Sequence, residues 1–128
     1  MSLIVHDTNA ITEGVIGAAI EVHRRLGPGL LESAYQACLA RELETRGIGH
    51  QKEVVIPLHY RGMQLEKAYV MDILVENKVI IEVKAVEKLV PIHQYQLLTH
   101  LRLTSLPVGL LINFNVRVLR DGLRRLLC

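Results

Sequence analysis

Two charged side chains interrupt an apolar stretch at residues 79–86, which runs VIIEVKAV. A strand this apolar is normally covered on both faces, so Glu82 and Lys84 cannot both point into open water. Because side chains alternate along a strand, the two project from the same face, about 7 Å apart. Burying an unpaired charge costs several kcal/mol, so these charges are expected to be paired or to serve a site.

A third charge, Asp72, lies in the preceding apolar segment AYVMDILVEN. The short connection Glu76-Asn77-Lys78 predicts an antiparallel hairpin, which places Asp72 beside Glu82 or Lys84, depending on the register. Two carboxylates in one cleft raise each other's pKa unless a cation intervenes; a lysine helps, and a hard divalent ion such as Mg²⁺ would satisfy both. The constellation is Asp-x9-Glu-x-Lys, and its structural alternative is an ion-pair network within the hairpin.

The elements that must position these residues follow from periodicity and from breaks in it. Helical patterns cover Thr12 to Leu26, ended by Gly27-Pro28-Gly29, and Leu31 to about Arg46, ended by Gly47. Strand patterns cover 52–60, 63–75 and 79–86; a helix starts at Pro91 and ends before Pro107, and strands follow at 108–114 and 122–127. The expected order is ααβββαββ, an α/β fold with a mixed sheet in which 79–86 and 108–114 are parallel.

Length and composition limit the classes of protein to consider. The 128 residues predict a single domain spanning 1–128, half of them apolar and 22% charged. No apolar run approaches the roughly 18 to 20 residues of a membrane span, and the N-terminus lacks a secretory signal, so a cytoplasmic protein is expected. Cys38 and Cys128 have no spacing that suggests zinc or a disulfide framework.

Charge is unevenly distributed along the chain. Residues 1–87 hold 9 Lys and Arg against 12 Asp and Glu, whereas residues 88–128 hold 6 against the single Asp121. Such a basic segment is either solvated surface or an anion-binding face. Aromatic residues make up only 4% of the chain, without Trp, which argues against extensive base stacking. Four arginines are candidates for contacts with a phosphate backbone: Arg117, Arg120, Arg124 and Arg125.

Taken together, these motifs resemble a known family. Asp72, Glu82 and Lys84 resemble the core of the PD-(D/E)xK nuclease superfamily. The segment AAIEVHRRLGPGLLESAY, with Gly29, Glu32 and Tyr35, resembles the small bacterial GxxExxY proteins that belong to it. The Asp-x9-Glu-x-Lys pattern alone is weak, but GxxExxY and the later PIHQYQLL make the resemblance strong from about Ile11 to Leu126. It implies a restriction-endonuclease-like core.

The resemblance also implies roles for individual residues. Metal-binding groups would be the carboxylates of Glu32, Asp72 and Glu82 with the carbonyl of Val83, holding Mg²⁺ or Mn²⁺. Lys84 would be the catalytic lysine. Two further positions are Gln96, which matches a Gln-x3-Tyr element bordering such sites although His100 replaces the Tyr, and Met71, which replaces the usual Pro before the first Asp.

The function implied by the resemblance is metal-dependent hydrolysis of phosphodiester bonds, with Asp72, Glu82, Lys84 and Gln96 at the catalytic site. The expected partner is nucleic acid, DNA in the first instance, and not a membrane. A homodimer is one arrangement that would cut two strands. The alternative is a catalytically inactive module of the same fold that binds nucleic acid or a protein partner.

Overall fold

The computed structural model describes residues 2–128, with side chains from Thr8 onward. Its elements in chain order are α1 (Ser2–Leu26), α2 (Glu32–Thr45), β1 (His50–Tyr60), β2 (Met63–Val75), β3 (Val79–Lys84), α3 (Pro91–Thr104), β4 (Val108–Asn113), the 3₁₀ helix η1 (Leu119–Gly122) and β5 (Leu123–Leu127). Apart from η1, this is the predicted order ααβββαββ.

Several boundaries differ from the sequence-based expectation, most by one or two residues, and two of the differences have a visible cause. Helix α1 begins well before Thr12, whose hydroxyl donates back to the carbonyl of Asn9 within the helix and therefore does not cap a helix start. Strand β3 ends at Lys84, before Val86, because the backbone N–H and C=O of Val86 bind the side chain of Asn113. The segment after Lys84 thus leaves the sheet.

The five strands form one mixed sheet in the order β1-β2-β3-β4-β5. Neighbouring strands are antiparallel except β3 and β4, which run parallel from the pair Val79 and Val108 to the pair Lys84 and Asn113. The predicted parallel pair is therefore confirmed. Helix α3 connects these two strands, and their carboxyl ends lie at the same edge of the sheet.

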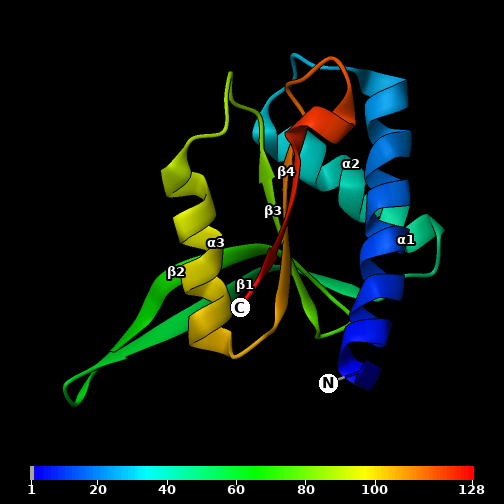
Figure 1. Cartoon of the computed structure of the whole chain (residues 1–128). Coiled ribbons are helices and arrows are strands. Elements are labelled where there is room, and N and C mark those ends of the chain that lie inside the picture. The colour runs from blue at the N-terminus through cyan, green and yellow to red at the C-terminus, as the bar shows by residue number, and fades with distance from the viewer. Residues whose placement is uncertain (1) are drawn as a thin grey trace.

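Helices cover both faces of the sheet (Figure 1). One apolar core packs α1 and α2 against one face and includes Val79, Ile81 and Val83 of β3. A second core packs α3 against the opposite face and includes Ile80. Alternation along β3 therefore directs Glu82 and Lys84 to the face of α3. The sequence predicted that the two share a face, and the structure shows which face it is. The β1–β2 hairpin extends away from the rest of the sheet (Figure 1).

In the described part of the chain, no helix combines the length and apolar character that crossing a bilayer demands.

Candidate active site

The hairpin register places Asp72 next to Glu82. Strands β2 and β3 pair Val75 with Val79 and end at the pair Ile73 and Ile81. The next residues along the two strands are Asp72 and Glu82, so the structure selects the first of the two registers that the sequence left open. The two carboxylates from separate strands are thus neighbours at the point where pairing stops.

Pairing stops because a side chain replaces a backbone partner. The carboxylate of Asp72 accepts a hydrogen bond of 2.8 Å from the backbone N–H of Val83. In a continued ladder, a backbone carbonyl of β2 would accept from that N–H. Met71 joins the core on the α3 side, although strict alternation from Ile73 would place it on the opposite face. Strand β2 therefore turns away from β3 at Asp72.

The partner strand β1 is distorted at the same level. Strands β1 and β2 pair Lys52 with Ile73 and Val54 with Met71, and Glu53 between them adopts a φ of +52°. This left-handed conformation is uncommon for a residue other than glycine. The β1–β2 ribbon thus changes direction where Asp72 faces β3. Where two strands diverge in this way, space opens between them, and here that space lies beside the carboxylate of Asp72.

Asp72 has a strongly perturbed pKa, raised from 3.8 to about 6. Partial burial is the largest cause, because removal from water disfavours the charged form. The negative charge of Glu82 raises the pKa further, as does that of Glu32, while the N–H of Val83 and the charge of Lys84 oppose these effects. The site therefore holds more negative charge than its own cation balances.

Glu82 is held by a histidine from the opposite layer. The Nδ1 atom of His100 on α3 lies 2.8 Å from Oε1 of Glu82, and both side chains are almost fully buried. The His100 ring also meets Tyr69 of β2 edge-on, with ring centroids 5.0 Å apart. His100 thus occupies the space between the diverging strands β2 and β3 and contacts a side chain of each.

Lys84 follows Glu82 on the same face and is half-buried. The backbone carbonyl of Lys84 accepts from the N–H of Phe114, which extends the parallel β3–β4 pairing by one hydrogen bond. The buried side chain of Asn113 binds both backbone groups of Val86. These bonds fix the backbone of Lys84 and of the segment that follows it.

The Gly-x-x-Glu-x-x-Tyr segment forms the turn into α2. Gly29 has a φ of +109°, a conformation that side chains strongly disfavour. The hydroxyl of buried Tyr35 donates to the carbonyl of Gly27 and accepts from the N–H of Leu30, at 2.5 and 3.1 Å. Its ring stacks on Phe114, with centroids 4.7 Å apart. Tyr35 is therefore a core residue, and it anchors the turn that precedes Glu32.

Glu32 is the first residue of α2 and is exposed. Its negative charge contributes to the raised pKa of Asp72, so Glu32 lies within electrostatic reach of that carboxyl. One turn later, the side-chain amide of Gln36 donates to the backbone carbonyl of Asp72 at 3.3 Å. The sequence reasoning missed Gln36; its position four residues after Glu32, on the same helix face, is the signal that would have identified it.

A cleft of about 310 Å³ opens beside this contact between α2 and β1. It is lined by Ser33, Gln36, Ala37, Lys52 and Glu53. Since Gln36 binds the Asp72 backbone and Glu53 lies level with Asp72 on β1, the cleft borders the site from the side of α2.

Gln96 lies on α3, one helical turn before His100, and is exposed. Residues four apart share a helix face, so Gln96 lies on the side of α3 that His100 presents to Glu82. Because α3 begins beyond the carboxyl end of β3 and returns along the sheet, Gln96 is nearer the Lys84 end than His100 is. The catalytic role carried over for Gln96 stays a prediction.

The four candidate arginines do not form one surface. Arg124 pairs with Leu111, which pairs with Glu82, so these three share one row and one face of the sheet. Arg125 points to the opposite face, where its guanidinium donates to the side chain of Asn9 on α1 at 2.6 Å. Arg117 and Arg120 are exposed in the segment after β4, at the edge of the sheet where β3 and β4 end. Arg124 is thus the strand arginine on the face of Glu82.

The donor set fits a hard divalent cation, although the described residues contain no group of three His, Cys, Asp or Glu side chains arranged to hold one. Asp72 and Glu82 supply carboxylate oxygens, which Mg²⁺ and Mn²⁺ prefer. The N–H and C=O of one strand residue point the same way in a ladder, so the carbonyl of Val83 is directed, like its N–H, toward Asp72. Glu32, in contrast, is exposed at the rim.

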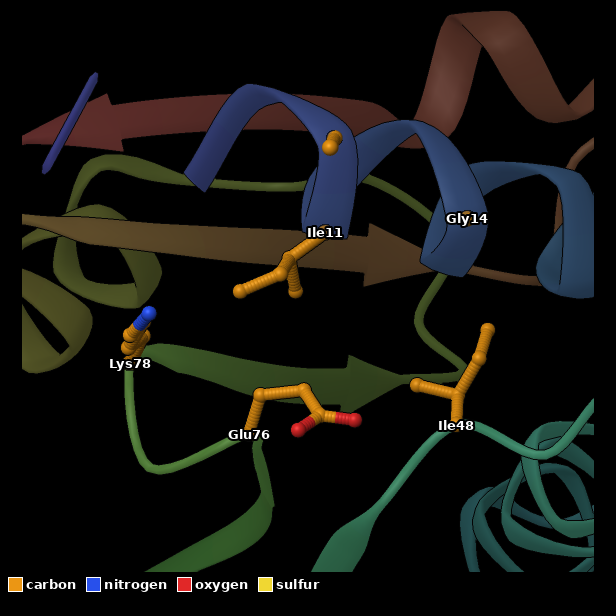
Figure 2. Close-up of a pocket in the computed structure, with 6 residues that line it drawn as sticks. Ile11, Gly14, Ile48, Glu76 and Lys78 are labelled. Atoms are coloured by element: carbon orange, nitrogen blue, oxygen red, sulfur yellow. The ribbon is translucent and has the colours of Figure 1, made fainter. Parts of the chain in front are cut away.

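A larger cavity, of about 390 Å³, lies elsewhere (Figure 2). Its lining includes Ile11 and Gly14 of α1, Ile48, and the turn residues Glu76 and Lys78. The Glu76 carboxylate accepts from the backbone N–H of Gly49 at 2.8 Å and so closes the loop before β1. Since Lys78 precedes β3 and Lys84 ends it, this cavity is at the opposite end of the strand from the carboxylate site and takes no part in it.

The mixed sheet, its helical layers and the order of elements are consistent with a restriction-endonuclease-like core. The family model of the PD-(D/E)XK nuclease superfamily matches residues 9–126. The chain therefore belongs to this superfamily. Comparisons with curated proteins and with solved structures give no significant match.

Proposed function

We propose that the protein is a nuclease of the GxxExxY type that hydrolyses phosphodiester bonds with Mg²⁺ or Mn²⁺, with DNA as the expected substrate. The observation that carries the proposal is the meeting of Asp72 and Glu82 at the end of strand pairing, with Lys84 on the face of Glu82. Two neighbouring carboxylates with a raised pKa on one of them are poised to bind a cation.

Asp72, Glu82 and the Val83 carbonyl would hold the ion, with Glu32 as a further ligand from the rim. When bound, the ion supplies Lewis-acid stabilisation of phosphoryl oxygens and lowers the pKa of water. Lys84 would orient the attacking water or contact the scissile phosphate, with Gln96 beside it. Arg117, Arg120 and Arg124 would contact the backbone without reading sequence. We place this activity in the cytosol, and a second copy of the chain would supply the second site for cutting both strands.

The second candidate function is an inactive module of the same fold that binds nucleic acid or a protein partner. The observation that favours it is the hydrogen bond between Glu82 and His100, which already occupies one of the two oxygens of the carboxylate. Such a module would retain the fold and bind without cleaving.

Cleavage of single-stranded DNA, duplex DNA and RNA by purified protein, with Mn²⁺ and with excess chelator, tests the proposal. We expect metal-dependent cleavage that Asp72→Asn abolishes, because the amide no longer supplies a charged ligand. The matched control is Glu66→Gln, which removes an exposed carboxylate from the same strand β2 and should cleave as the wild type does. Binding without cleavage of any substrate would favour the inactive module.

A further inference from the structure

His100 has no counterpart in the roles assigned so far, yet it is among the few polar side chains that are almost fully buried. Its ring is fixed on two sides, by the edge-on contact with Tyr69 and by the hydrogen bond to Glu82. A buried histidine often serves the core alone: His23 does so here, with Nε2 2.7 Å from the backbone carbonyl of Val116. His100 differs from His23 in that its partner is a carboxylate beside Asp72.

The contact uses one oxygen of Glu82. Since Nδ1 of His100 lies 2.8 Å from Oε1, a ring N–H donated to that oxygen fixes the rotation of the carboxylate. The other oxygen, Oε2, is then the ligand atom left to a cation. A carboxylate free to rotate would lose conformational entropy on binding a cation, whereas one held in place has already lost it.

We propose that His100 is a positioning residue that orients Glu82 as a monodentate ligand of the divalent cation. This inference rests on the proposed function. His100 donates from Nδ1 to Oε1, Tyr69 holds the imidazole ring in place, and the other oxygen, Oε2, would be the one available to the ion. Hydrogen-bond donors to metal-ligating carboxylates typically account for about 10- to 100-fold in metal affinity.

Two substitutions separate positioning from packing. His100→Asn places an amide N–H near the position of Nδ1 and keeps the donor, whereas His100→Phe fills the space without a donor. Isothermal titration with Mn²⁺, at a temperature where each variant is folded by circular dichroism, should give a dissociation constant for His100→Phe about 10- to 100-fold above the wild-type value. His100→Asn should restore most of the affinity.

The control is His23→Gln, in which a buried histidine with a backbone partner is replaced by a residue that retains a donor near Nε2. It should leave Mn²⁺ affinity unchanged even if it lowers the melting temperature. Equal affinities for His100→Phe and the wild type would overturn the inference while leaving the proposed metal site intact. A wild-type protein without saturable Mn²⁺ binding would overturn the proposed function, and the inference with it.

Discussion

The Asp72 carboxylate and the Val83 backbone N–H are joined by a 2.8 Å hydrogen bond just beyond Ile73 and Ile81, the last β2–β3 pair. A side-chain carboxylate here accepts the hydrogen bond that a backbone carbonyl of β2 would otherwise accept, at the place where β2 departs from β3. The bond compensates for the lost ladder and also keeps Asp72 beside Glu82. Because both carboxylates are partly or fully removed from water, the solvent screens the repulsion between them only weakly. This repulsion should affect the stability of the folded protein in ways that can be measured.

The first consequence concerns the pH dependence of stability. The pKa of Asp72 is raised from 3.8 to about 6 on folding, so between these values the folded state binds more protons than the unfolded state. The free energy of unfolding contributed by Asp72 therefore falls as pH rises through this window. We expect a loss of about 1–2 kcal/mol between pH 4 and pH 7 from this group, after allowance for its partial exposure.

Urea denaturation of metal-free wild type and Asp72→Asn at several pH values measures this contribution. The asparagine retains an oxygen that accepts from the Val83 N–H but does not ionise, so the variant should lack the fall in stability assigned to Asp72. At pH 7 without metal it should be the more stable protein. Identical pH profiles for the two proteins would contradict the raised pKa.

The turn before α2 provides a second prediction. Tyr35→Phe removes the hydroxyl that binds Gly27 and Leu30 but leaves the ring on Phe114. Two backbone groups lose a partner, so the free energy of unfolding should fall by about 1–3 kcal/mol. The same urea experiment measures it. Tyr95→Phe, in which the exposed tyrosine of α3 loses its hydroxyl, is the matched control and should be neutral.

Periodicity predicted the elements of this fold because the amphipathic and apolar segments are interrupted by strong breaks. The Gly27-Pro28-Gly29 turn and the Glu76-Asn77-Lys78 connection both lie where they were expected. The geometry of the site was harder to predict from the sequence. Asp-x9-Glu-x-Lys indicated which charges meet, but the departure of β2 from β3 depends on the hydrogen bond between Asp72 and Val83, which no local pattern encodes.

His100 is a second example of a contact that the sequence could not predict. Its place four residues after Gln96 was visible in the sequence, whereas its bond to Glu82 depends on how α3 packs across the sheet. From the sequence alone, the two adjacent arginines of β5 are equal candidates for phosphate contacts. Strand alternation separates them onto opposite faces, and the register then shows which of them shares a row with Glu82.

This separation gives a third prediction, on binding to nucleic acid. Each lost phosphate contact should reduce the slope of log affinity against log salt by about 1, because fewer counterions are released. Arg124→Ala should show this reduction, since Arg124 lies on the face of Glu82. Arg125→Ala should keep the wild-type slope, because Arg125 faces α1 and binds Asn9. Fluorescence anisotropy over a range of salt concentrations measures both, and a flatter slope for Arg125→Ala alone would place the nucleic acid on the other face.

The last prediction separates catalysis from metal binding and concerns Lys84. If its ammonium group acts on water or on the scissile phosphate, Lys84→Met should retain Mn²⁺-dependent stabilisation and nucleic-acid binding while cleavage falls by at least about 10²-fold. Methionine keeps much of the apolar stem, so the variant should fold. The natural control is Lys88→Met, an exposed lysine in the segment after β3, which should cleave normally.

A structural role for Lys84 leads to a different pair of results. As a counter-ion only, Lys84 would stabilise the metal-free protein against the repulsion between Asp72 and Glu82, and a bound divalent cation would make it dispensable. Lys84→Met would then lower the melting temperature without metal and cleave at nearly the wild-type rate at saturating Mn²⁺. Because melting temperature and turnover are measured in the same buffer, with and without Mn²⁺, the two roles give opposite outcomes. A stable Lys84→Met protein that cleaves at the wild-type rate would exclude a catalytic lysine at this position.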